Sequence, residues 1–306
     1  MKRSCTYLRV VATTRCNLQC RYCHAEGDPQ RGDEAHALPF ADLDAALDVA
    51  SRLGIRKYKF LGGEPLLRGD LPDVVRSLRA RAPDADLSVI TAGVRPAAKL
   101  EALYDAGLTR ANVSVHGFAP DKLAERIPAA NAHAQREAFL AYAMSTGKPL
   151  KLNYVYSNVF AKKDLADLLA WAAGKPVTVG LLDDLNKDYS WRTLDKVLRD
   201  LRGPPARIER CEDPDSLDTA LYVWDDGLRV ELKDRQLGEV APWKACDGCP
   251  KKAVCKEGIH ALRLDHLGQL RPCMDRPDLT FPLVEAIRAH GVEAATGQAR
   301  AWLEEV

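Results

Sequence analysis

Three cysteines stand close together near the N-terminus of this 306-residue chain, at Cys16, Cys20 and Cys23. Their spacing is C-x3-C-x2-C. A [4Fe-4S] cluster needs four ligands, which are normally all thiolates. Three thiolates leave one iron open, and an open iron can bind and activate another molecule. The alternatives are buried core cysteines and a zinc site with His24 as a fourth ligand, although zinc sites usually combine C-x2-C pairs.

A second cysteine group lies near the C-terminus. Cys246, Cys249 and Cys255 follow the spacing C-x2-C-x5-C, and Cys273 comes later in the chain after a longer gap. Four cysteines can fill every ligand position of an iron–sulfur cluster or of a zinc ion, so their spacing alone leaves both open. Clustered cysteines in a reducing compartment indicate metal ligands or catalytic groups rather than disulfides.

The composition excludes several classes of partner. The chain has 44 Lys and Arg against 43 Asp and Glu, a formal charge of +1, and gives no support for binding nucleic acid or an anionic membrane. No stretch approaches the ~20 apolar residues of a membrane span, and the polar N-terminus lacks the apolar core of a signal peptide. We therefore expect a cytoplasmic protein.

Short apolar runs alternate with helical patterns from Leu8 to Leu201. Strict alternation of this kind predicts a parallel sheet with helices outside it. Six βα units are too few for an ordinary eight-fold barrel, so an open partial barrel or a doubly wound sheet fits the pattern. The predicted strands cover residues 8–12, 58–61, 87–90, 112–115, 150–156 and 177–181.

The pattern changes after Gly203-Pro204-Pro205. Two apolar runs flank Asp225-Asp226-Gly227, which indicates a hairpin, and the second cysteine group and a helical tail follow. We expect two domains, residues 1–204 and 205–306.

The first cysteine group resembles that of the radical S-adenosylmethionine (radical SAM) superfamily. Cys16, Cys20, Tyr22 and Cys23 follow the first predicted strand, and Gly62-Gly63-Glu64-Pro65 follows the second. The resemblance implies a partial (β/α)6 TIM-like barrel. It also implies that the three cysteines hold a [4Fe-4S] cluster whose open iron binds SAM, and that cleavage of SAM gives a 5′-deoxyadenosyl radical.

The same resemblance implies roles for other residues. Tyr22 would lie beside the adenine, Gly62 and Gly63 would bind the SAM ammonium through backbone carbonyls, and Glu64 would assist. Ser114 or His116, and either Asn153 or Tyr154, are expected at the barrel mouth as SAM or substrate contacts, since alternation lets one residue of a neighbouring pair face inward. Relatives often carry Thr-Asn-Gly where this chain has Thr91-Ala92-Gly93, which favours an unusual substrate.

The second group resembles SPASM domains, the auxiliary-cluster extension of this superfamily. Ile259 replaces one family cysteine, and Leu232 stands where another is expected after Cys211 and Gly227. The resemblance therefore implies one auxiliary [4Fe-4S] cluster held by Cys246, Cys249, Cys255 and Cys273, in a small α+β domain of the abbreviated (twitch) form. The region also resembles the twitch domain of molybdopterin-pathway cyclases, in which three cysteines leave an iron open; four cysteines argue against that arrangement.

We expect a small-molecule substrate, since Cys16 lies so close to the N-terminus that no room is left ahead of it for a leader-binding domain. Single-cluster relatives act on sugars and aminocyclitols in natural product biosynthesis. Asp183, Asp184 and the acidic residues after Cys211 predict a carboxylate-lined entrance for the substrate. The alternative is that these carboxylates lie in solvated loops. An external one-electron reductant of the flavodoxin or ferredoxin type is also expected.

Two reactions then compete. Epimerisation, slightly favoured, needs a hydrogen-atom donor, for which Cys211 is the candidate and Cys5 the weaker one. Dehydrogenation of an alcohol would use the auxiliary cluster as electron acceptor. For Cys211, the alternative is a structural role as a small buried apolar residue. For the whole protein, the further alternatives are a peptide-modifying enzyme and a non-enzymatic metal-binding sensor.

Overall fold

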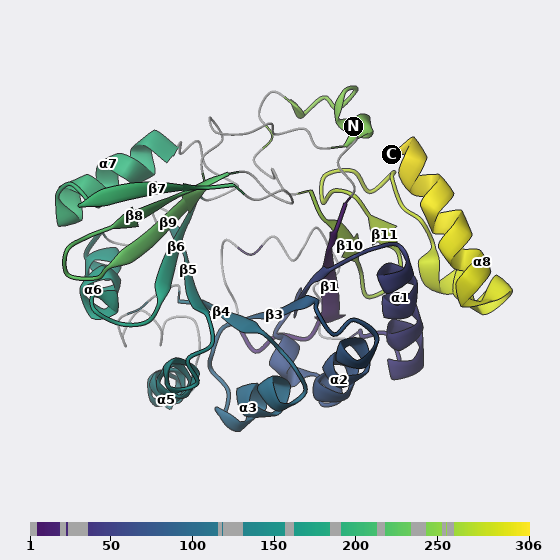
Figure 1. Ribbon diagram of the computed structural model, residues 1–306, viewed down its shortest axis with the longest axis horizontal. Coiled ribbons are helices and arrows are strands. Elements are labelled where there is room, and N and C mark those ends of the chain that lie inside the picture. Colours follow the sequence, from purple (N-terminus) through teal and green to yellow (C-terminus); the bar gives the residue numbers. More distant parts are fainter. Residues whose placement is uncertain are drawn as a thin grey trace.

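The computed structural model describes residues 5–18, 23, 36–115, 118, 131–156, 162–183, 191–212, 218–233, 243–252, 255 and 260–306. In these ranges one sheet has the strand order β11-β10-β1-β2-β3-β4-β5-β6-β9-β8-β7. The sheet curves but does not close, because β11 and β7 remain as its two edges (Figure 1). Its six central strands are parallel and consecutive: β1 (Tyr7–Thr13), β2 (Lys57–Gly62), β3 (Asp86–Thr91), β4 (Arg110–Ser114), β5 (Leu150–Tyr156) and β6 (Thr178–Asp183).

Helices follow these strands and cover the convex side of the sheet (Figure 1). The predicted α/β class, with an open and largely parallel barrel-like sheet, is confirmed. The helices are α1 (Phe40–Arg52), α2 (Leu71–Arg81), α3 (Ala98–Asp105), α5 (Ala132–Ser145), α6 (Lys162–Ala172) and α7 (Trp191–Arg202).

The main core lies between the convex side of the sheet and the helices. In β2, Tyr58 and Phe60 are fully buried and belong to one apolar cluster with Leu43 and Leu47 of α1. Because side chains alternate along a strand, Lys59 faces the opposite, concave side. The helix layer therefore fixes which residues the sheet presents to its concave face.

The C-terminal third of the chain extends the sheet at both ends. The strands β7 (Arg207–Cys211), β8 (Thr219–Val223) and β9 (Arg229–Lys233) form an antiparallel meander, and β9 pairs in parallel with β6. At the other end, β10 (Leu262–Leu264) pairs in parallel with β1, and β11 (Leu270–Arg271) is antiparallel to β10. The division at residue 204 stays a prediction, and β7 was not predicted.

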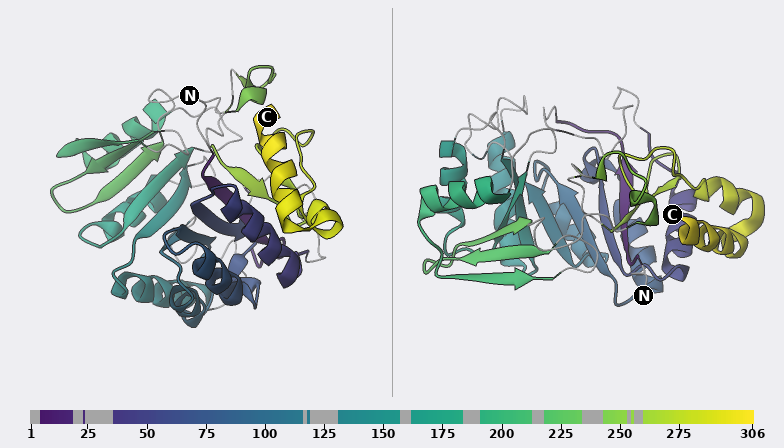
Figure 2. Two further views of the ribbon diagram at one scale, coloured as in Figure 1. Left: turned by 45° about the vertical axis from the view of Figure 1, so that its right-hand side comes forward. Right: turned by 90° about the horizontal axis from the view of Figure 1, so that it is seen from above.

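The final helix α8 (Leu283–Glu305) packs along α1 at one edge of the molecule (Figure 2). Arg288 forms an ion pair with Asp42 of α1 at 2.6 Å. At the C-terminus, the carbonyl of Val306 accepts a hydrogen bond of 2.7 Å from Ala245, in the short 3-10 helix η3 (Lys244–Cys246). None of the helices described is long and apolar enough to cross a membrane.

Candidate functional site

The ends of β1 and β2 are in close backbone contact at Gly62 and Gly63. A Cβ atom at Gly63 would lie 2.2 Å from the carbonyl oxygen of Arg15, and one at Gly62 would lie 2.3 Å from that of Thr13. The amide of Gly63 donates to Thr13 at 2.8 Å, and that of Glu64 donates to Arg15 at 2.8 Å. In the structure, the two glycines therefore let the segment that leads into Cys16 lie against the end of β2.

Glu64 joins the ends of β2 and β3. Its carboxylate is 2% exposed and accepts hydrogen bonds from the Thr91 hydroxyl at 2.7 Å and from the Ala92 amide at 2.8 Å. It also accepts from the amide of Leu66 at 3.1 Å. Burial raises the pKa of this carboxyl, while these hydrogen bonds act in the opposite direction. Glu64 thus positions the Gly-Gly turn, and its expected assistance to SAM stays a prediction.

Cys16 of the first cysteine group follows closely on the end of β1. Cys16 is half-buried and Cys23 is exposed, whereas Cys20, Tyr22 and His24 lie outside the described residues. The base of the loop is closed by His36, whose carbonyl accepts from the Thr14 amide at 2.9 Å and whose amide donates to the Thr14 hydroxyl at 2.9 Å. The loop therefore starts at the carboxyl end of a parallel strand, where α/β enzymes place their sites.

Ser114 and Asn153 are register neighbours on β4 and β5 and lie on the same face of the sheet. Tyr154 points the other way, because its hydroxyl contacts Asp164 of α6 at 3.2 Å. Asn153 is therefore the member of its pair that faces the concave side, as alternation requires. His116, the other candidate from β4, is not among the described residues.

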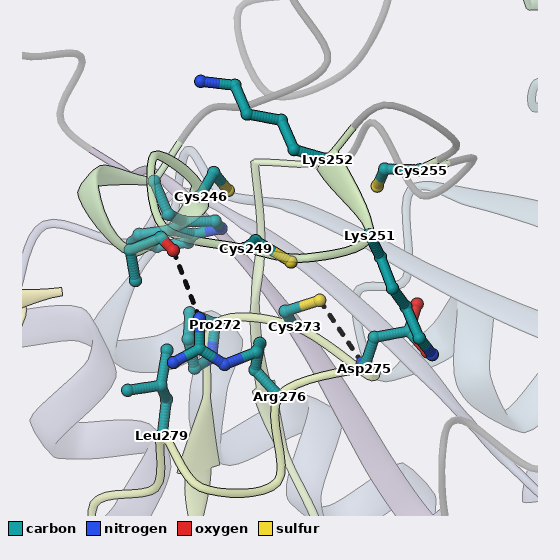
Figure 3. Close-up of a pocket in the computed structure, with 12 residues that line it drawn as sticks. Cys246, Cys249, Lys251, Lys252, Cys255, Pro272, Cys273, Asp275, Arg276 and Leu279 are labelled. Atoms are coloured by element: carbon teal, nitrogen blue, oxygen red, sulfur yellow. Dashed lines mark hydrogen bonds and ion pairs between the residues drawn. The ribbon is translucent and has the colours of Figure 1, made fainter.

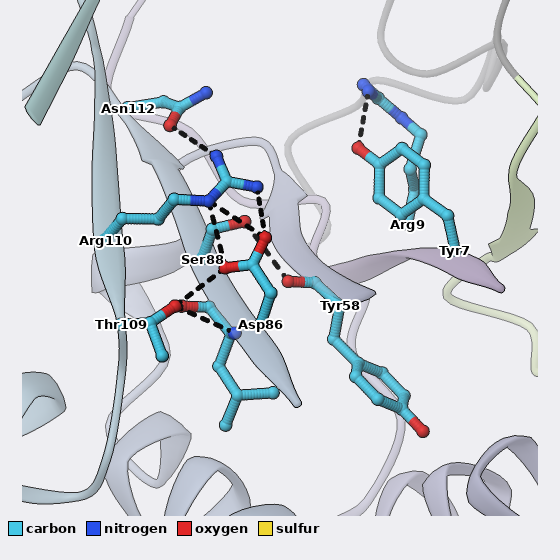
Figure 4. A network of polar contacts seen from close by, with 9 residues as sticks. Tyr7, Arg9, Tyr58, Asp86, Ser88, Thr109, Arg110 and Asn112 are labelled. Carbon is cyan, nitrogen blue, oxygen red and sulfur yellow. Dashed lines mark hydrogen bonds and ion pairs between the residues drawn. The ribbon is translucent and has the colours of Figure 1, made fainter. Parts of the chain in front are cut away.

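Cations dominate the concave face. Strand register places Arg263, Arg9 and Lys59 side by side on β10, β1 and β2, and the same face continues through Arg110 to Lys151. Two carboxylates on this face are paired: Asp86 with Arg110 at 2.7 Å, and Glu231 with Lys151. Figure 4 shows Arg110 and Asp86 in this network, with the Tyr58 ring pointing away from it.

Two lysines on this face have strongly lowered pKa values. Burial lowers the pKa of Lys233 to about 7, and the nearby charges of Lys151, Arg9 and Lys59 lower it further. Burial also lowers the pKa of Lys59 well below its usual value, with Arg110 and Arg9 as the largest electrostatic contributors. The mutual effects show that cations from opposite parts of the sheet share one region, which an anion would stabilise.

Cys211 belongs to the same concave face. It is the last residue of β7 and is in register with Thr219 on β8, which is in register with Lys233 on β9. Residues directly opposite each other in adjacent strands point to the same side. β7 runs in the same direction as β6, so Cys211 lies at the carboxyl-end rim of the sheet, half-buried, on its outermost strand.

The predicted carboxylate-lined entrance falls mostly on undescribed residues. Asp184, Asp213 and Asp215 lie outside the described ranges, and Glu212 is exposed. Sequence reasoning missed the cations of the concave face, whose charge is opposite to that expectation. A signal was available, since Lys57 and Lys59 alternate with the aromatic residues of β2.

The second cysteine group assembles around one pocket. Cys246, Cys249, Cys255 and Cys273 all line it, together with residues such as Trp243 and Arg276. Figure 3 shows the four thiols around a common space. Burial raises the pKa of Cys246, and the neighbouring Cys255 and Cys249 raise it further. None of the cysteines that the structure describes forms a disulfide.

The chemistry of these thiols fits the predicted auxiliary [4Fe-4S] cluster, whose ligands bind separate irons. Four thiolates also fit tetrahedral zinc, so the choice between the two stays a prediction. Cys246, Cys249, Cys255 and Cys273 are the residues that would hold either group.

Relatives of known name align along most of the chain. The GTP 3',8-cyclase of Nautilia profundicola is 31% identical over 299 residues, covering 96% of this chain and 88% of the relative. The probable GTP 3',8-cyclase of Methanocella arvoryzae is 33% identical over 185 residues, covering 60% of this chain and 58% of the relative. The chain thus spans little more than half of the latter protein.

A solved structure supports the fold. Streptococcus suis SuiB bound to its precursor peptide SuiA has a TM-score of 0.60 and 15% identity, covering 88% of this chain and 59% of that chain. This similarity concerns the fold alone. The model of the radical SAM superfamily matches residues 10–172, a segment that includes Cys16, Cys20 and Cys23, the Gly-Gly-Glu-Pro turn and strands β2 to β5. With this match and the aligned cyclases, the chain belongs to the radical SAM superfamily.

Proposed function

We propose that this enzyme epimerises an anionic, sugar-containing small molecule, with Cys211 as the hydrogen-atom donor. When bound at Cys16, Cys20 and Cys23, the [4Fe-4S] cluster and SAM supply the radical that removes a hydrogen atom from the substrate. The observation that carries the proposal is the composition of the concave face, which combines the Cys211 thiol with Lys233 and other cations.

The cations support an anionic substrate. Cations that repel one another destabilise this face, and a bound phosphate or carboxylate would offset that repulsion. Arg9, Arg263 and Lys59 lie side by side and suit such a group. The aligned relatives are named for GTP, which contains both a ribose and phosphates. Ribonucleotides and sugar phosphates are therefore the first compounds to test.

Cys211 supports inversion at carbon. Its S–H bond breaks as a C–H bond forms on the substrate radical, leaving a sulfur-centred radical on Cys211. One electron and one proton then restore the thiol, and the electron comes from an external reductant of the flavodoxin or ferredoxin type. The donor must stand on the substrate side of the sheet, and the register with Thr219 and Lys233 supports this position.

The test is turnover in D2O with the nucleotide and sugar phosphate panel. We expect one deuterium at an inverted carbon in the product, and its loss in Cys211→Ala. Cys5→Ala is the matched control, because Cys5 lies two residues before the start of β1, with its thiol 3.4 Å from the Tyr7 carbonyl. Inversion without deuterium, or deuterium incorporation that survives in Cys211→Ala, would contradict the proposal.

Oxidation of an alcohol is the second candidate, favoured by the four-thiol pocket. If the four cysteines ligate every iron of a second cluster, that cluster has no open position for substrate and suits electron transfer. The same reasoning weighs against cyclisation on a three-cysteine cluster. Oxidation would give a product two mass units lighter and no deuterium at carbon, so the same experiment separates the two reactions.

A further inference from the structure

A lysine crosses one strand of the concave face to reach its partner. Lys151 on β5 forms an ion pair with Glu231 on β9, and β6 runs between these two strands (Figure 1). Gly180 of β6 is in register with Glu231 and leaves room for this crossing, because a glycine has no side chain. A Cβ at Gly180 would meet the Cε atom of Lys151 and would lie 3.4 Å from its Nζ atom. The Lys151 side chain therefore lies over the backbone of Gly180.

Asn153 borders the same glycine from the other side. It is in register with Gly180, and its amide oxygen would lie 3.1 Å from a Cβ at that position. Asn153 is 9% exposed, while the side chains of Lys151 and Glu231 are 25% and 24% exposed. An amide and an ion pair whose charges cancel thus surround a position without a side chain. These residues offer hydrogen bonds and space without a net charge.

The charge differs at the other end of the same face. There, adjacent positions on β10, β1, β2 and β3 hold three cations and a hydroxyl: Arg263, Arg9, Lys59 and Ser88. Such a row suits a phosphate or a carboxylate. A substrate that lies across the sheet would therefore place its anionic group over β1 and β2, and uncharged hydroxyl groups over β5, β6 and β9.

We propose that Glu231 is a specificity-determining residue, which prevents Lys151 from binding a second anionic group of the substrate. The proposal rests on the proposed function and narrows its substrate class to sugars with an anionic group at one end only. A second phosphate over β6 would have to displace the Glu231 carboxylate from Lys151, and that carboxylate would repel it. A repulsive element of this kind rejects the wrong ligand and leaves the binding of the right one unchanged.

The test measures the binding of fructose 6-phosphate and of fructose 1,6-bisphosphate, which differ by one phosphate at the far end of the sugar. The protein is the reconstituted full-length enzyme with SAM and without reductant, so that no turnover occurs, and isothermal titration calorimetry gives each Kd. In Glu231→Gln, the Kd of the bisphosphate should fall about tenfold, which is the effect of one more charge-assisted hydrogen bond. The Kd of the monophosphate should change by less than about twofold, because its phosphate lies at the other end of the face.

Two further variants separate the cause of this gain from a general change in the protein. Lys151→Met combined with Glu231→Gln should abolish the gain, because the second phosphate then lacks its cation. Glu209→Gln is the matched control and should leave both Kd values unchanged. Glu209 lies on β7, in register with Leu221 and through it with Glu231, but it is 44% exposed and pairs with Arg207 at 2.6 Å.

Three results would overturn the proposal. The first is a Kd of the bisphosphate in Glu231→Gln that equals the wild-type value. The second is a gain that persists in the double variant or also occurs in Glu209→Gln. The third is wild-type enzyme that already binds the bisphosphate about tenfold more tightly than the monophosphate, since Lys151 would then accept a second phosphate. Wild-type enzyme that binds neither sugar nor inorganic phosphate would instead refute the anionic substrate of the proposed function.

Discussion

Replacing Gly63 by alanine tests whether glycine is required there for the close backbone contact between the end of β2 and the segment that leads into Cys16. The new Cβ would meet the Arg15 carbonyl oxygen at 2.2 Å, where ordinary contact begins at 3.4 Å. One backbone segment must therefore move away until that contact is an ordinary one. Such a shift lengthens the 2.8 Å hydrogen bonds from Gly63 to Thr13 and from Glu64 to Arg15 beyond hydrogen-bonding distance.

The expected loss follows from those two bonds. Each contributes about 1 kcal/mol, so their loss costs about 2 kcal/mol. Gly69→Ala is the matched control: nothing lies within 4 Å of its added Cβ, and the smaller entropy of the unfolded chain should stabilise it by about 0.5 kcal/mol. The two variants should therefore differ by about 2–3 kcal/mol, or roughly 4–10 °C in Tm.

Iron content adds a second measurement. The displaced segment leads directly into Cys16, so Gly63→Ala should retain about four irons at the second cluster and lose most of the first. Thermal unfolding and iron analysis on both variants provide the test. The reasoning is refuted if Gly63→Ala has the Tm and iron content of Gly69→Ala, since the close approach to Arg15 would then have no consequence.

Three further predictions concern the concave face and the second cysteine group. Lys233→Met should stabilise the protein by about 1–3 kcal/mol at pH 7, because the wild-type lysine prefers the neutral form when folded and the charged form when unfolded. This gain in stability should be full below about pH 7 and should disappear as the pH rises toward 10.5. Thermal melts of both proteins at pH 7 and 9.5 provide the measurement. A gain that does not change with pH would contradict the prediction. Lys59→Met should raise KM for an anionic substrate about tenfold or more with a smaller change in kcat, whereas the exposed Lys196→Met should leave both unchanged; steady-state kinetics decides. Cys255→Ser should reduce reconstituted iron from about eight atoms toward about four, while Cys5→Ser keeps about eight; an unchanged iron content in Cys255→Ser would remove that residue from the ligand set.

The periodic part of the fold could be predicted from the sequence. Runs such as residues 58–61 are apolar on the helix-facing side, and their alternation with helical patterns identified the six central strands. β7 could not be found in this way, because Arg207–Cys211 is an edge strand that is exposed along most of its length. Backbone hydrogen bonds to β8 hold β7 in the sheet. Such backbone pairing produces no apolar pattern in the sequence.

The site was predicted in parts. Spacing identified the four cysteines of the second group, and the structure places them around one pocket. The cationic concave face was missed because Arg9 and Lys59 appear in the sequence as polar residues of half-buried strands. Only the pairing of β1 with β2 and β10 shows that Arg9, Lys59 and Arg263 lie side by side. Pairing between strands distant in sequence is not encoded in local periodicity.

The pairing of β1 with β10 has a consequence for the order of folding. Leu8 is in register with Tyr58 on one side and with Leu262 on the other. During synthesis, β1 can pair with β2 as soon as the second strand leaves the ribosome, whereas its contact with β10 must wait for nearly the whole chain. We therefore expect the loop of Cys16 to be positioned early and the second cysteine group to be completed last. Until then, β1 is an exposed edge strand that can pair with other chains.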